Sequence, residues 1–84
     1  MDQASVLRDP TRDLLRSPHF LLRAAGRTDS ELRDLITAMC TEIRLAVVII
    51  HVEASGSERG SHRVVWQSIS GGPFEDHWFT VPTD

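Results

Sequence analysis

Four histidines and one cysteine are the side chains of this 84-residue chain that could bind a metal ion or act in catalysis. They are His19, His51, His62, His77 and Cys40. Compact zinc sites use closely spaced pairs of such ligands, and these five residues have no such spacing. The chain also has no nucleophile elbow and no phosphate-binding loop. We therefore predict that the protein binds no metal ion or other cofactor and is not an enzyme.

Arginines near the N-terminus could carry a second kind of chemistry, the binding of phosphate groups. Arg8, Arg12 and Arg16 recur every four residues, which places them on one face of a helix. A basic helix can contact a nucleic-acid backbone. However, Asp9 and Asp13 lie beside them at spacings that favour ion pairs within the helix. A homodimeric nucleic-acid-binding regulator that uses these arginines is therefore our alternative hypothesis.

The composition gives no indication of a disulfide-bonded, membrane-spanning or strongly charged protein. A net charge of −3 does not by itself indicate a strongly charged partner, and the single cysteine excludes a disulfide within the chain. The longest apolar run, residues 45–50, is too short to span a membrane, and no signal peptide is visible. We expect one small cytoplasmic domain over residues 1–84, in which residues 1–8 form a flexible arm.

Two or three helices are expected in the first half of the chain, because the two short ones could merge into one kinked helix. Asp9 and Ser17 each precede a proline, the typical start of a helix, so short helices should begin at residues 10 and 18. Thr28 and Glu31 form a capping box for the clearest helix, residues 29–43. Its apolar residues follow a helical period and are Leu32, Leu35, Ile36, Met39, Cys40 and Ile43.

The second half predicts a three-stranded antiparallel sheet from residues 44–54, 62–69 and 76–82. The fold class is therefore α+β with the order ααβββ, and the main helix should pack on one face of the sheet. Centring each hairpin on its loop places Val52 opposite Val64, Ile50 opposite Trp66, and Trp66 opposite Phe79. The predicted inner face consists of Ala46, Val48, Ile50, Val52, Val64, Trp66, Phe79 and Val81.

The reverse face of this predicted sheet is the candidate binding surface, because it combines apolar and polar side chains. Its candidate contact residues are Val47, Ile49, His51, Glu53, Val65, Gln67 and Trp78. We expect Trp78 to be the main anchor, since tryptophan often dominates binding energy at interfaces. In another arrangement, which the sequence leaves open, the N-terminal helices fold across this face and bury it.

These features together predict a small protein-binding module that binds another protein and also forms a homodimer. Glu58, Glu75 and Asp76 could present negative charge to a basic partner. A compact, non-enzymatic module of this kind would suit a phage or mobile element that blocks a host protein by occupying its surface.

Overall fold

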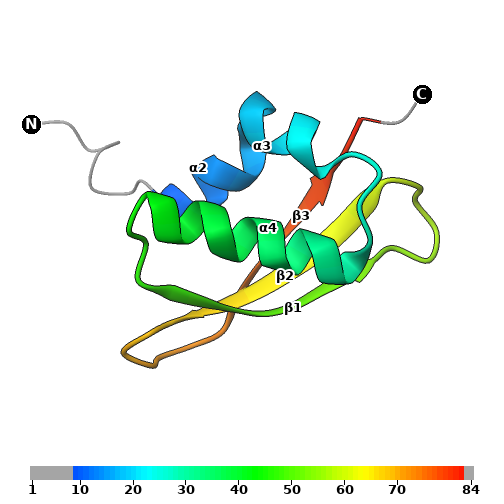
Figure 1. Cartoon of the computed structure of the whole chain (residues 1–84). Helices are drawn as coiled ribbons and strands as arrows, with labels where there is room; N and C mark the ends of the chain where they lie inside the picture. The colour runs from blue at the N-terminus through cyan, green and yellow to red at the C-terminus, as the bar shows by residue number, and fades with distance from the viewer. Residues whose placement is uncertain (1–8, 83–84) are drawn as a thin grey trace, which may run out of the picture.

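The computed structural model describes residues 9–82 and has the predicted α+β architecture (Figure 1). Three helices precede a three-stranded antiparallel sheet with the strand order β1-β2-β3. The helices are α2 (Pro10–Arg16), α3 (Pro18–Ala24) and α4 (Asp29–Glu42), and the strands are β1 (Val47–Ala54), β2 (Ser61–Ser68) and β3 (Glu75–Thr80). The predicted arm, residues 1–8, lies outside the described residues.

Each helix starts where its capping residue predicts. The Asp9 side chain accepts hydrogen bonds from two backbone N–H groups of α2, and the Ser17 hydroxyl accepts one from Phe20 N at 3.1 Å. At α4 the capping box is complete, because Glu31 N donates to Thr28 Oγ1 at 3.2 Å and Thr28 N donates to Glu31 Oε1 at 2.9 Å. These bonds satisfy N–H groups that a helix leaves free at its start.

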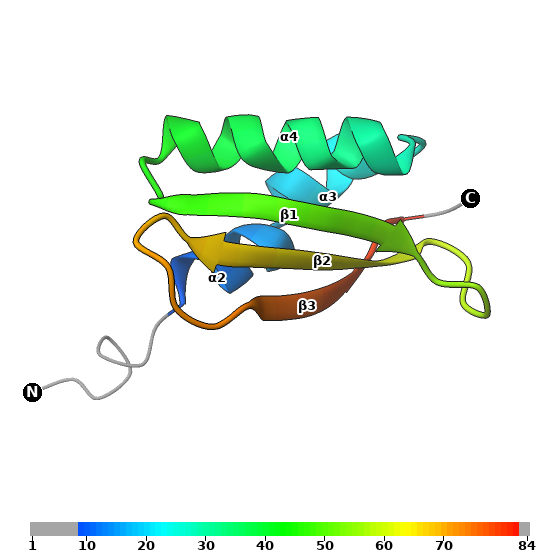
Figure 2. The ribbon, with the colours of Figure 1, turned by 90° about the horizontal axis from the view of Figure 1, so that it is seen from below.

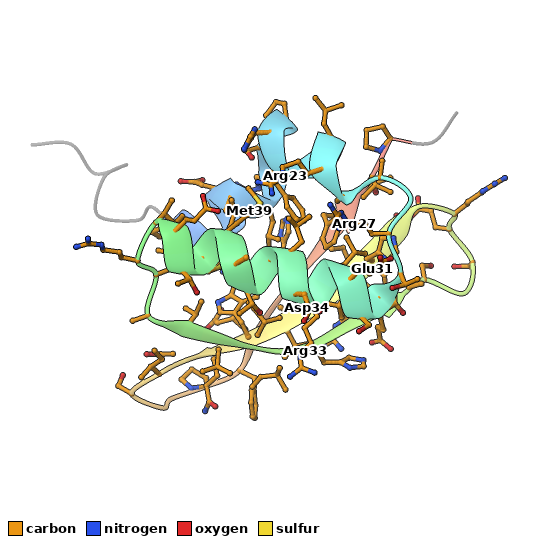
Figure 3. All side chains as sticks on the ribbon, in the orientation of Figure 1. Arg23, Arg27, Glu31, Arg33, Asp34 and Met39 are labelled. Carbon is orange, nitrogen blue, oxygen red and sulfur yellow. The ribbon has the colours of Figure 1, made fainter. Side chains whose placement is uncertain are left out.

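All three helices lie on the same side of the sheet (Figures 1 and 2). Helix α4 packs along β1, whereas α2 contacts β3. Figure 3 shows Met39 pointing from α4 into the space between the helices and the sheet. The core there is apolar and consists of Leu15, Phe20, Ala24, Leu32, Leu35, Ile36, Met39, Cys40, Ile49, Val52, Val64, Trp66, Phe79 and Val81. We call the opposite side of the sheet the open face.

The connection from α4 to β1 is a helix stop that normally uses glycine. Leu45 N donates to Cys40 O at 2.9 Å and Arg44 N donates to Thr41 O at 3.1 Å, which is the Schellman pattern. Arg44 therefore takes the left-handed conformation, with φ of 59°. Among the non-glycine residues described, it alone has positive φ. The conformation is unfavourable for a residue with a Cβ atom.

A β-bulge in β1 overturns part of the predicted register. Val52 lies opposite Val64 as predicted, but Ile49, not Ile50, lies opposite Trp66 because Ile50 is an extra residue in the strand. The bulge reverses the predicted directions of the side chains before it. Leu45, Val47 and Ile49 therefore face the helices, and the predicted inner residues Ala46, Val48 and Ile50 are exposed instead.

The second hairpin is also displaced from the predicted pairing. Phe79 lies opposite His62, not Trp66, a slip of four residues along β2. The chain turns earlier than the centre of its loop, because Gly71 N donates to Ser68 O at 3.0 Å and closes a tight turn there. A slip by an even number of residues leaves each side chain on its original face. Phe79 and Val81 are thus buried as predicted.

Candidate protein-binding face

Exposed apolar side chains gather on and beside the open face. Val48 and Ile50 of β1 and Trp78 of β3 lie on it, and Trp78 is 51% exposed. Ile69 and Phe74, which is 64% exposed, lie in the β2–β3 loop at one end of the face. Of the large apolar side chains that are exposed in residues 9–82, these five belong to the sheet and its β2–β3 loop, and two others, Leu22 and Ile43, belong to the helical half.

Two predicted contact residues, Val47 and Ile49, do not belong to this surface. Ile49 is only 4% exposed and is part of the core, and Val47 is half-buried and packs against the core. The prediction was wrong for both because a regular strand was assumed through Ile50. The bulge presents Val48 and Ile50 to the open face in their place.

The other predicted contact residues, His51, Glu53, Val65, Gln67 and Trp78, do lie on the open face. Gln67 Nε2 donates a hydrogen bond to Gly72 O at 2.8 Å, which fixes this amide against the β2–β3 loop. Strand pairing places Val48 beside Gln67, and His51 beside Val65. The apolar part of the face thus extends from the bulge toward the β2–β3 loop.

A chain of charged residues crosses the open face toward the end of the sheet where the β1–β2 loop lies. Arg63 Nε donates to Asp76 Oδ2 at 2.9 Å, and Arg63 Nη1 donates to Glu53 Oε1 at 3.4 Å. His51 Nε2 lies 3.7 Å from Glu53 Oε2. The guanidinium of Arg63 thus joins the three strands. Its single positive charge is outnumbered by the two negative charges of Glu53 and Asp76. Trp78 lies directly opposite Arg63 on the neighbouring strand.

The three arginines that were predicted to form a basic contact surface, Arg8, Arg12 and Arg16, are not all available to a partner. Arg8 lies outside the described residues. Arg12 is paired with Asp9 and with Glu75 Oε1 at 3.2 Å, and it donates to Asp76 O at 2.9 Å. Its guanidinium carbon lies 5.0 Å from the centre of the Trp66 ring. Arg12 therefore joins α2 to the sheet, and Arg16 is the exposed arginine of α2.

The predicted acidic residues do not form one cluster. Glu58 lies in the β1–β2 loop, where its carboxylate accepts a hydrogen bond from Ser61 Oγ at 3.2 Å. Glu75 and Asp76 begin β3, at the other end of β2, and are bound to Arg12 and Arg63 respectively.

Asp9, the cap of α2, is also held by hydrogen bonds. Burial raises the pKa of its carboxyl group, but hydrogen bonds from the backbone and guanidinium of Arg12 and from the backbone of Thr11 outweigh this effect and lower the pKa.

The histidines are separated in the fold. His62 Nδ1 lies 3.3 Å from Asp29 Oδ1 at the start of α4, and its ring stacks on Phe79. His77 lies half-buried on the inner side of β3, where burial and the positive charges of Arg16 and Arg12 lower its pKa. Within residues 9–82, no three His, Cys, Asp or Glu side chains come close enough to hold a metal ion.

Comparisons of the chain with protein-family models, with curated proteins and with solved structures each found no match. Across the part of the chain that the structure describes, no helix is long and apolar enough to cross a membrane. The feature of the molecule that bears on function is therefore the open face itself.

Proposed function

We propose that the protein is a small binding module whose open face docks onto another protein. The partner surface would be apolar where it meets Trp78, Val48 and Ile50, with a basic side chain facing the excess carboxylate of the Arg63 network. The observation that carries the proposal is that all three helices cover one side of the sheet and leave exposed apolar side chains on the other. Such patches usually mark interaction sites.

The network of Arg63, Glu53 and Asp76 supports docking because these charged side chains are already paired with one another. Arg63 is held by Glu53 and Asp76 before any partner arrives, so ordering these side chains on binding costs little additional entropy. A partner cation could then be attracted by the remaining negative charge. The sequence-based prediction that such docking blocks a host protein, as a phage inhibitor would, stays a prediction.

Nucleic-acid binding remains the alternative, with Arg16 as its candidate contact. The internal bonds of Arg12 disfavour it, because a guanidinium bound to Glu75 and stacked on Trp66 is not free to reach a phosphate. Binding of this kind would weaken steeply as salt is raised. It would also depend on Arg16 and not on Trp78.

The two functions can be separated with matched variants. Extract of the source organism is passed over immobilised wild type, Trp78→Ala and Leu22→Ala, because Leu22 is 71% exposed but belongs to α3. We expect a retained protein that is lost with Trp78→Ala and kept with Leu22→Ala. Its purified form should shift the tryptophan fluorescence of the wild type but not that of Trp78→Ala, in which Trp66 is the remaining tryptophan. Equal retention by both variants, or a labelled DNA duplex that binds through Arg16, would refute docking through the open face.

A further inference from the structure

The outer edge of β3 is a second surface that the fold leaves available. The sheet has two edges, β1 and β3. The β1 edge is bordered by α4, whose Arg33 lies on the β1 side of the helix (Figure 3), and it is interrupted by the bulge at Ile50. Both features protect an edge from pairing. Strand β3 has no bulge, and Figure 2 shows no described helix or strand along its outer edge.

The backbone groups that point outward from β3 can be identified from two hydrogen bonds. Val81 N donates inward to Gly60 O at 2.9 Å, whereas Asp76 O accepts from Arg12 outside the sheet at 2.9 Å. Because direction alternates along a strand, Trp78 and Thr80 share the outward direction of Asp76. Their outward N–H and C=O groups form no hydrogen bond with any other residue in the described range.

We propose that this edge pairs with a second copy of the chain, antiparallel and about a two-fold axis at Trp78. Trp78 would then exchange N–H···O bonds with the partner's Trp78, and Thr80 would do so with the partner's Asp76. The carbonyl oxygen of Asp76 has two lone pairs, so it would accept this bond beside the one from Arg12. Two three-stranded sheets would become one six-stranded sheet, and the two open faces would join on one side of it. This pairing does not require the docking proposed for the open face, although Trp78 takes part in both.

The side chains of β3 are compatible with an axis at Trp78 and disfavour an axis at either of the two adjacent outward-facing residues, Asp76 and Thr80. An axis at Asp76 would place two carboxylates directly opposite each other, which is unfavourable. An axis at Thr80 would place Trp78 opposite the partner's Pro82, which has no N–H to donate. An axis at Trp78 instead pairs aromatic with aromatic and carboxylate with hydroxyl, and such cross-strand pairs are favourable.

The inner side of this edge carries a mixed polar and apolar hollow that would lie beside the same partner. It has a volume of about 240 Å³ between the two short helices and β3, and Leu15, Arg16, Leu21, His77 and Phe79 are among its lining residues. Leu15 and Phe79 are buried in the core, so Leu21 is the apolar side chain of these that is partly exposed. The two-fold axis would bring the two hollows together beside the paired strands. Burial of Leu21 and of the paired Trp78 side chains would thus accompany the backbone hydrogen bonds, as an edge contact needs in order to be stable in water.

A proline at position 80 tests the backbone pairing. Thr80→Pro removes an outward N–H and no bond to β2, so an edge strand tolerates it. Thr80→Val is the matched control, because it also loses the 2.8 Å hydrogen bond between Thr80 Oγ1 and Ser61 Oγ but keeps the N–H. By sedimentation equilibrium, we expect wild type and Thr80→Val to approach twice 9.4 kDa with rising concentration. We expect Thr80→Pro to dimerise at least tenfold more weakly.

Cross-linking provides a test that does not depend on how well the proline variant folds. A hydrogen-bonded pair at the axis has Cα atoms about 5.5 Å apart, within reach of a disulfide. Mild oxidation should therefore link Trp78→Cys into dimers in high yield, whereas Arg33→Cys on α4 should stay monomeric. A wild type that remains a 9.4 kDa monomer, or equal linking of both cysteine variants, would overturn the proposal. A monomeric protein that still binds its partner would leave only the docking proposal standing.

Discussion

Arg12→Ala should destabilise the fold more than any other exchange of a basic surface residue. The guanidinium makes ion pairs with Asp9 and Glu75, a hydrogen bond to Asp76 O, and a cation–π contact with Trp66. Partly exposed ion pairs contribute about 0.2–1 kcal/mol each, the cation–π contact roughly 0.5–1 kcal/mol and the carbonyl bond about 0.5–1.5 kcal/mol. We therefore expect a loss of about 2 kcal/mol in the free energy of unfolding.

Urea titration of Arg12→Ala and Arg16→Ala measures this effect with an internal control. Arg16 lies one turn further along α2 and makes no ion pair with another described residue. A loss of about 2 kcal/mol corresponds to a fall of roughly 8–16 °C in melting temperature for a domain of this size. Equal midpoints for the two variants, within about 0.5 kcal/mol, would refute the structural role of Arg12.

Four further changes test other parts of the structure. Because its pKa is lowered from 6.5, His77 binds fewer protons in the folded than in the unfolded state, so the free energy of unfolding should fall as pH drops below about 6.5. His77→Gln should flatten that slope in urea titrations at pH 7.5 and 5.5. Arg44→Gly should raise the free energy of unfolding by about 0.5–1 kcal/mol, because φ of 59° suits glycine; a lower melting temperature would contradict this. Thr28→Ala should lower the free energy of unfolding by about 1 kcal/mol, because it removes the helix cap. Ser30→Ala, at the same end of α4, should change it by less than about 0.5 kcal/mol. Burial raises the pKa of the Cys40 thiol, so a disulfide reagent should label it only after unfolding; rapid labelling of the folded protein would contradict its position in the core.

The starts of the helices could be predicted because their causes are local. Asp9, Ser17 and Thr28 cap residues within three positions of themselves, so the sequence near each cap contains the whole interaction. The faces of β2 and β3 were also predictable, since apolar and polar residues alternate there and an even slip in register leaves that alternation unchanged.

The register of β1 could not be predicted from its residues. Positions 45–50 are all apolar, so a period of two fits equally well with odd or even residues turned inward. The packing of α4 on the sheet and the bulge at Ile50 decide between the two, and neither is a local property. The contacts of Arg12 were missed for the same reason, because Glu75 lies 63 residues further along the chain.

The way in which the fold resolves this ambiguity in β1 supports the docking that we propose. Once Leu45, Val47 and Ile49 face the helices, the core needs nothing from Val48 and Ile50, which point to water on the open face. Threonine would suit an exposed strand position as well and would avoid the exposed apolar surface. Folding therefore does not explain why both positions are apolar, and neither does it explain the exposure of Trp78 on the same face. The docking that we propose would explain all three, because burial against another protein would give these side chains the favourable energy that folding does not.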